Sequence, residues 1–176
     1  MSSSEASFFV SDPCPIDNPN YASIEGVCYF LQSVKWSHMK AKTECNSQTV
    51  NGVKGRLFEP RSLSTNDLVF SKFVSVHGNQ NIHIGIDDLD QQNKWVYSTS
   101  KEVATFSNWE KGQPNAGSAH CVHFWNAHPK LWGDIGCNDN LASICEFRSG
   151  KIFQIESCHC SIKLLHNQLH TGKHPT

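Results

Sequence analysis

Residues 109–115 read Trp-Glu-Lys-Gly-Gln-Pro-Asn, and residues 132–134 read Trp-Gly-Asp. The first stretch lies within an irregular segment, residues 106–132, that is rich in Gly, Asn, Pro and Trp and shows little periodicity, and the second stretch begins at the last residue of that segment. A long irregular segment inside a compact domain is usually functional. The sequence therefore predicts a functional loop in this region.

The flanking segments have the periodicities of helices and strands. Residues 37–47 favour a helix with Ser37 as a possible N-cap. Residues 64–67 (Ser-Thr-Asn-Asp) have the form of a capping box that begins a second helix, in which Asp67 reaches back to the cap amide. Period-two alternation or buried apolar runs predict strands at residues 29–31, 82–87, 95–97 and 122–124. Two helices and several short strands indicate an α+β domain with small antiparallel sheets.

Length and charge exclude several classes of protein. A chain of 176 residues allows one domain with room for a tail. The formal net charge is −1, so the chain lacks the basic field expected of a nucleic-acid or anionic-membrane binder. No apolar run approaches the roughly 18 residues that cross a bilayer. We therefore expect no nucleic-acid partner and no transmembrane segment, and the sequence leaves the oligomeric state open.

Cysteine usage predicts disulfide bonds and an oxidising compartment. An even number of cysteines in a short chain is typical of crosslinked extracellular domains. Structural zinc, the alternative, favours pairs spaced as C-x2-C, whereas the only close pair here is separated by one residue. Eight thiols allow about 105 pairings, so the count fixes none of them. The cysteines are Cys14, Cys28, Cys45, Cys121, Cys137, Cys145, Cys158 and Cys160.

The N-terminal residues do not resemble a secretory signal. Residues 1–5 are polar and acidic, and residues 7–10 are too short for an apolar signal core. We expect a secreted or extracellular domain whose signal peptide is not present in this chain, because the signal was removed, the gene model is truncated, or the domain comes from a longer protein. We divide the chain into a flexible lead (1–13), a domain (14–147) and a tail (148–176), which is poor in apolar residues and is interpreted as a disordered appendage.

Several motifs of residues 14–147, in their order and spacing, resemble the C-type lectin-like domain in its long form. Residues 132–134 stand where the family has W-N-D, and residues 109–115 are similar to its W-x-x-G-[EQ]-P-[ND] run. The other matching segments are residues 28–30 (CYF), 55–60 (GRLFEP), 83–86 (HIGI, where the family has W-I-G-L) and 144–147 (ICEF). The resemblance implies a lectin-like fold that serves extracellular recognition, including innate recognition.

The resemblance also implies a disulfide pairing. In the family pattern, the framework bridges correspond to Cys45–Cys145 and Cys121–Cys137, and the extra bridge of the long form corresponds to Cys14–Cys28. Cys158 and Cys160 have no family counterpart.

A calcium-dependent sugar site is implied by the family but only partly matched by this chain. In the family, oxygens from the E-P-N or Q-P-D motif, from an acid before the third framework cysteine and from W-N-D bind Ca²⁺ and the sugar. Gln113, Asn115 and Asp134 match ligand positions, whereas Gly133 replaces the Asn and residues 118–120 contain no carboxylate. Because Ca²⁺ takes six to eight oxygens, we expect weak calcium binding or none.

Two functions follow from this resemblance. In the first, the domain binds carbohydrate through Gln113, Asn115 and Asp134, with weak or absent calcium dependence. In the second, it is a calcium-independent module that binds a protein or another surface ligand through the same loop. Trp125 could supply an apolar platform for either ligand, whereas Trp132 is expected to pack in the core. No motif of a hydrolase, zinc protease or phosphate-binding loop is present, so we do not expect an enzyme.

Polar residues near the loop have two interpretations each. Imidazoles suit Zn²⁺, but the spacing of His120, His123 and His128 favours surface histidines, whose titration near pH 6.5 would make binding sensitive to pH. Asp88 matches an accessory calcium ligand in the family, but the segment around it is more simply interpreted as a solvated turn.

Overall fold

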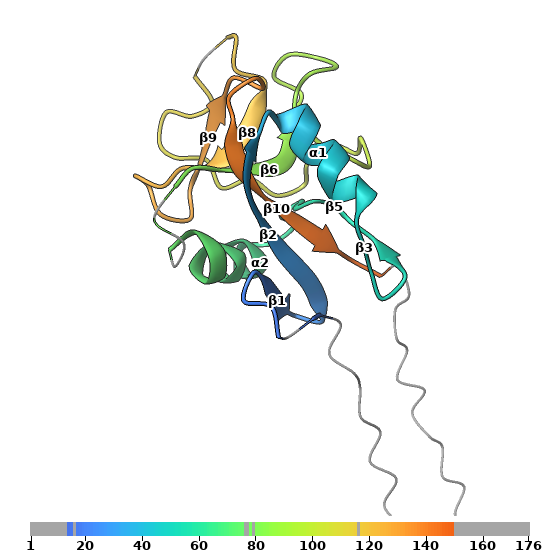
Figure 1. Ribbon diagram of the computed structural model, residues 1–176. Coiled ribbons are helices and arrows are strands. Elements are labelled where there is room, and N and C mark those ends of the chain that lie inside the picture. The colour runs from blue at the N-terminus through green and yellow to red at the C-terminus, as the bar shows by residue number, and fades with distance from the viewer. Residues whose placement is uncertain (1–13, 16, 76–77, 79, 116, 150–176) are drawn as a thin grey trace, which may run out of the picture.

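The computed structural model describes residues 14–149 except 16, 76–77, 79 and 116 (Figure 1). The predicted lead, nearly all of the predicted tail, and Cys158 and Cys160 lie outside the described residues. No helix within the described part of the chain has the length and apolar character needed to span a membrane.

One mixed sheet organises the domain. β6 and β10 pair in parallel, and the other described strand pairs are antiparallel. The α+β class is confirmed, although most of the strands join one sheet rather than several small ones. Neighbouring strands of the sheet follow the order β1 (Tyr21–Ile24), β2 (Val27–Trp36), β10 (Leu141–Phe147), β6 (Ile82–Asp87), β8 (Cys121–Phe124) and β9 (Trp132–Ile135). Two short strands also join this sheet: β5 (Arg56–Leu57) pairs with β10, and β7 (Val96–Tyr97) pairs with β6. A separate hairpin consists of β3 (Thr49–Val50) and β4 (Val53–Lys54).

The two predicted helices form, and one begins earlier than expected. Helix α1 (His38–Ser47) has the predicted cap, Ser37. Helix α2 (Leu63–Val69), which continues into the π-helical turn η1 (Phe70–Val74), is capped by the hydroxyl of Ser62, which accepts a hydrogen bond from the Thr65 N–H at 3.2 Å. The capping box predicted at residues 64–67 is wrong, because Asp67 pairs with Lys130 at 3.1 Å instead of reaching back.

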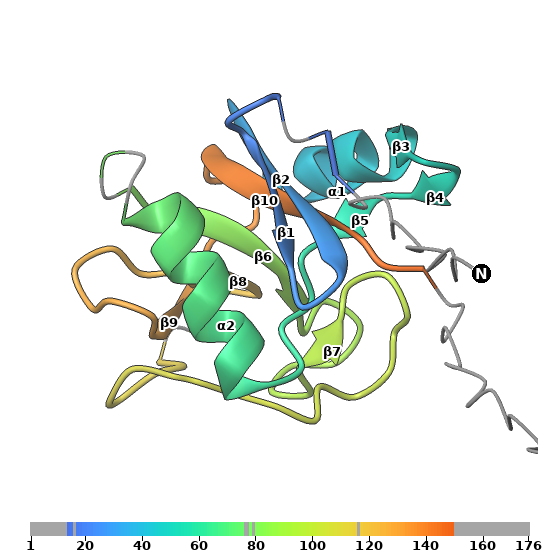
Figure 2. The same cartoon turned by 90° about the horizontal axis from the view of Figure 1, so that it is seen from below.

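The helices lie on opposite sides of β2 and β10 (Figures 1 and 2). A large apolar core of the sheet packs with α2 and η1, and a smaller core around Cys45–Cys145 packs with α1. Strand β6 is consequently buried on both faces, including its polar residues His83 and Asp87. Its period-two alternation marks apolar and polar sides, both of which are covered.

Three disulfide bonds form with the pairing that the resemblance implies. Cys45–Cys145 joins α1 to β10 and closes a loop of 100 residues, and Cys121–Cys137 joins β8 to the segment after β9. Cys14–Cys28 holds the first described residue against β2. Loop-closure entropy makes such bonds worth about 3 to 5 kcal/mol each.

The first and last described residues lie at one end of the molecule. Cys14 is bonded to Cys28, and Cys28 is paired with Phe147 near the end of β10. Figure 1 shows this end at the bottom of the view, while the loops that precede β8 lie at the opposite end.

Three histidines are buried in and beside the sheet. His38 is fully buried, its Nε2 lies 3.1 Å from the carbonyl oxygen of Ile84, and its ring packs edge-on against His83. Burial, reinforced by the neighbouring His83, lowers the pKa of His38 to about 4. Burial also lowers the pKa of His123 to about 4 and lowers that of His83. The folded domain therefore requires neutral imidazoles at these positions.

This arrangement predicts a stability that falls on acidification. An unfolded histidine titrates near pH 6.5, so below that pH the unfolded chain binds more protons than the folded one. The free energy of unfolding is fully retained above about pH 6.5 and falls toward pH 4, on the order of 2 kcal/mol for each of His38 and His123 by pH 4.5. Urea unfolding at a series of pH values measures this loss.

A His38→Gln protein removes one titrating group and keeps an amide that can bond the Ile84 carbonyl. Its free energy of unfolding should depend less steeply on pH between 6.5 and 4.5. The matched control is His128→Gln, which removes an imidazole that is 41% exposed. Equal slopes for wild type and His38→Gln would contradict the assignment.

Candidate functional site

The long loop brings Asn115 to Asp134. Strand β9 carries Asp134 opposite Val122 of β8, and the Asn115 backbone N–H donates to Asp134 Oδ1 at 3.1 Å. The peptide bond between Gln113 and Pro114 is cis. Two of the three predicted ligand residues therefore lie next to each other.

Asn115 and Asp134 line a cavity of about 230 Å³, which we call the polar cavity. It lies between the loop that contains Asn115 and the loop that follows β6. Its remaining lining residues are Asp88, Gln92, Asn93, Trp95, Pro114, Gly117 and Ala119. The lining is mainly amide and carboxylate, which suits a ligand with many hydroxyl groups.

Gln113 and Trp125, the other predicted site residues, are not part of this lining. Gln113 is half-buried, and its Oε1 atom is buried without a hydrogen-bond partner. Trp125 is half-buried and packs on His128, with 4.5 Å between ring centroids. Trp132 is 1% exposed, which confirms the expectation that it packs in the core.

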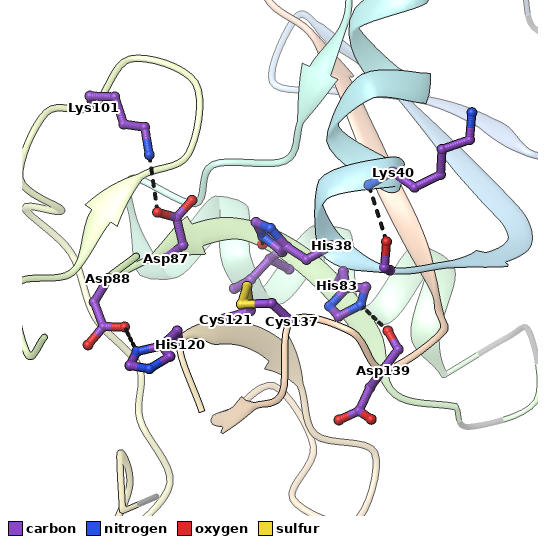
Figure 3. Close-up of a disulfide and its surroundings, with 12 residues drawn as sticks. His38, Lys40, His83, Asp87, Asp88, Lys101, His120, Cys121, Cys137 and Asp139 are labelled. Atoms are coloured by element: carbon purple, nitrogen blue, oxygen red, sulfur yellow. Dashed lines mark hydrogen bonds and ion pairs between the residues drawn. A yellow bond between two sulfur atoms is a disulfide. The ribbon is translucent and has the colours of Figure 1, made fainter. Parts of the chain in front are cut away.

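Asp88 joins the two loops that flank the polar cavity. Its Oδ1 lies 2.8 Å from His120 Nδ1, and its Oδ2 accepts a hydrogen bond from the Asn93 N–H at 2.6 Å. Its backbone N–H donates to the His120 carbonyl at 3.1 Å. The interpretation of this segment as a solvated turn is wrong for Asp88, which is 2% exposed because both loops fold over it. Figure 3 shows the Asp88–His120 pair beside the Cys121–Cys137 disulfide.

A second contact joins the same loops. Gln92 Nε2 donates to the carbonyl oxygen of Gly117 at 3.2 Å. Together with the Asp88–His120 and Asn115–Asp134 contacts, it joins the walls of the polar cavity by hydrogen bonds.

The rings of His123 and Trp125 occupy the space that a side chain at residue 133 would need. His123 and Gly133 are cross-strand partners in β8 and β9. A Cβ added to Gly133 would lie 2.8 Å from His123 Nε2 and 3.1 Å from Trp125 Cε3. The missing Asn ligand is thus a packing requirement of this chain.

The three loop histidines do not share one environment. His123 is 4% exposed, so the expectation that it is a surface group is wrong, because β6 and β9 flank it in the sheet. His120 pairs with Asp88, and His128 Nδ1 lies 3.6 Å from Glu110 Oε1.

The donor set does not fit a high-affinity calcium site. Gly133 offers no side-chain oxygen, Ala119 is buried, and the His120 ring pairs with Asp88. Asp88 and Asp134 are the two carboxylates on the lining. Among the residues that the structure describes, no group of three or more His, Cys, Asp or Glu side chains could hold a metal ion.

The fold and the loop together define a C-type lectin-like domain. A family model, the Lectin C-type domain, matches residues 33–147, and the chain belongs to this family. A perlucin-like protein of Mytilus galloprovincialis is 31% identical over 120 residues, which are 67% of this chain and 74% of that protein. Collectin-10 of Xenopus tropicalis is 29% identical over 121 residues, which are 68% of this chain and 41% of the collectin. The chain thus spans about two fifths of the length of that collectin.

Solved structures show the same fold. Human lithostathine superposes with a TM-score of 0.67 at 20% identity, over 77% of this chain and 100% of that chain. The C-type lectin CEL-I from Cucumaria echinata has a TM-score of 0.66 at 19% identity, over 77% of this chain and 99% of that one. A calcium-independent type II antifreeze protein has a TM-score of 0.62 at 21% identity, over 76% and 92% of the two chains.

Sequence reasoning missed part of the lining. Asn93 and Trp95 line the polar cavity but match no motif that we used. Asn93 has a φ of 62°, a left-handed conformation in which Asn is enriched, so Asn93 was compatible with a tight turn. No signal in the sequence indicated that this turn faces residue 115.

Restoring the family residue at position 133 should destabilise the domain. In Gly133→Asn, the new side chain must displace His123 or Trp125, which we expect to cost about 1 to 3 kcal/mol of unfolding free energy. Urea denaturation measures the loss. Gly117→Asn is the matched control, because a Cβ there meets only the side-chain nitrogen of Gln92, at an ordinary contact distance of 3.7 Å. A Gly133→Asn protein as stable as the control would refute the packing argument.

Proposed function

We propose that the domain is a carbohydrate-binding recognition module whose sugar site is the polar cavity. The observation that supports this best is the convergence of Asn115 and Asp134 on one small, open, polar cavity. Both residues match positions that bind sugar hydroxyls in the family, whereas Gln113, which matches a third such position, does not line the cavity.

The lining provides both donors and acceptors for the hydrogen bonds that the hydroxyls of a sugar ring make. The Asn115 amide can donate to one hydroxyl and accept from its neighbour, while the Asp134 carboxylate accepts. Asp88 and Asp134 give the cavity a negative potential, which disfavours sialylated or sulfated sugars. The site therefore suits a neutral hexose.

Calcium has little part in this proposal. Gln113, Asn115 and Asp134 would hold Ca²⁺ weakly at best, because they offer one carboxylate and two amides. The contacts Asp88–His120 and Gln92–Gly117 join the cavity walls through groups of the protein, which supports a preorganised cavity. Binding with weak or absent calcium dependence follows from this preorganisation.

We place this function outside the cell. Three disulfide bonds, one of which closes a 100-residue loop, persist in oxidising compartments. A protein or another surface ligand bound by the same loop is the alternative, and a failure of all sugars in the next experiment would favour it.

Substitutions on the cavity lining should weaken sugar binding. On a glycan array, we expect neutral hexose glycans to bind equally with and without EDTA. Asn115→Ala or Asp134→Asn should lower the affinity for the best glycan at least about tenfold, the equivalent of one or two hydrogen bonds. The matched controls, Asn140→Ala and Asp139→Asn, change exposed residues of the same types outside the lining. Undiminished binding by both lining variants would place the sugar elsewhere.

Calcium should stabilise the domain little. With a dissociation constant near the millimolar range, 2 mM CaCl₂ should raise the Tm by no more than about 3 °C relative to EDTA. Differential scanning calorimetry measures the shift, and MgCl₂ at the same concentration is the control for ionic strength. A large Tm increase at micromolar Ca²⁺, or glycan binding abolished by EDTA, would show that the donor count misjudges the site.

A further inference from the structure

A second, larger cavity adjoins the polar cavity. It has a volume of about 440 Å³, within the range of small-molecule sites, and we call it the aromatic cavity. Its lining includes three amide side chains, from Gln91, Gln92 and Asn93, and three aromatic rings, from Trp95, Phe106 and Trp109. Asn115 and Asp134, which carry the proposed sugar site, do not line this cavity.

The aromatic part of the lining is rigid. Trp95 and Trp109 meet edge to face with centroids 5.0 Å apart, and Trp109 and Phe106 both pack against Trp132. The indole N–H of Trp132 donates to Asn66 Oδ1 at 2.8 Å, which fixes that ring from behind. A ligand would therefore meet a preformed surface, and little conformational entropy would be lost on binding.

The two cavities share part of their lining. Gln92, Asn93 and Trp95 border both of them, so a ligand seated on Asn115 and Asp134 can extend along these residues without crossing the core. Trp95 is half-buried, which leaves part of its ring at the junction.

We propose that the aromatic cavity binds a second, uncharged hexose ring of an oligosaccharide whose first ring occupies the polar cavity. This inference rests on the proposed sugar-binding function and extends it from one ring to two. A hexopyranose has an apolar C–H face and a rim of hydroxyls. The C–H face suits the rings of Trp95 and Trp109, and the hydroxyls suit the three amides of the same lining.

The chemistry of the lining favours a sugar over an acyl chain. A lipid tail in this cavity would desolvate the side chains of Gln91, Gln92 and Asn93 without giving them hydrogen-bond partners, which is costly. No carboxylate lines the cavity, and Lys94 is the one charged residue among those described. A neutral ring with an apolar C–H face and a rim of hydroxyls satisfies both the aromatic and the amide groups of the lining.

The experiment compares the binding of monosaccharides with that of disaccharides, using the whole 176-residue protein. The probes are methyl α-mannoside with mannobiose, methyl β-galactoside with lactose, and N-acetylglucosamine with diacetylchitobiose, each titrated by calorimetry. For the sugar type that binds, the disaccharide should bind at least about tenfold more tightly than its monosaccharide. The indole N–H signal of Trp95 in an NMR spectrum should shift more with the disaccharide.

A bulky substitution in the aromatic cavity tests the binding of the second sugar ring separately from that of the first. Val103 lines the aromatic cavity and not the polar one, and its side chain is 56% exposed. Val103→Arg should reduce the affinity for the disaccharide to that of the monosaccharide. The matched control is Leu63→Arg, at an equally exposed apolar residue of α2 outside both cavities, which should keep the disaccharide advantage.

The outcomes separate this inference from the proposed function. Monosaccharide binding without a disaccharide advantage would overturn the second-ring site and leave the proposed function standing. An advantage for octyl glycosides over methyl glycosides, with none for disaccharides, would overturn it in favour of an apolar occupant. If none of these sugars binds, the proposed function and the second-ring site both fail.

Discussion

The buried carboxylate of Asp88 is the contact on which the geometry of the loop depends. It bonds His120 of one loop and Asn93 of the other, and its own backbone N–H reaches the His120 carbonyl. Asp88 is 2% exposed, so leaving its carboxylate without these partners would cost far more than a surface hydrogen bond. The two loops are held together by this requirement, and both cavities lie along the same pair of loops.

The disulfide and the sheet supply the rigid base beneath this contact. Cys121, which directly follows His120, is bonded to Cys137, and β8 lies between β6 and β9 in the sheet. The loop is therefore fixed at its end by a covalent bond and in its middle by hydrogen bonds.

Much of the fold could be predicted from the sequence, because strand periodicity is a local signal and the family motifs with their cysteines keep a fixed order and spacing. The alternation of residues 82–87 gave the central strand, and ordered motifs from Cys28 to Phe147 gave the family and its pairing. The errors at Asp88 and His123 share one physical origin, which is burial by segments distant in sequence, whereas the capping box failed because Ser62 caps α2 and Asp67 pairs with Lys130. Asp88 and His123 resemble surface residues in the sequence, but a second loop covers one and neighbouring strands cover the other. The site was only partly predictable for the same reason, since Asn93 and Trp95 reach the cavity through the packing of two loops.

The position of the chain ends affects how the cavities can be presented. Both ends of the described chain meet at the Cys14–Cys28 bridge beside β10, opposite the loops that carry the cavities. Immobilising or fusing the domain at either end would leave the two cavities pointing away from the support. Several copies arranged on a scaffold would then present their cavities in parallel, and repeated glycans on one surface could be bound by many weak sites at once.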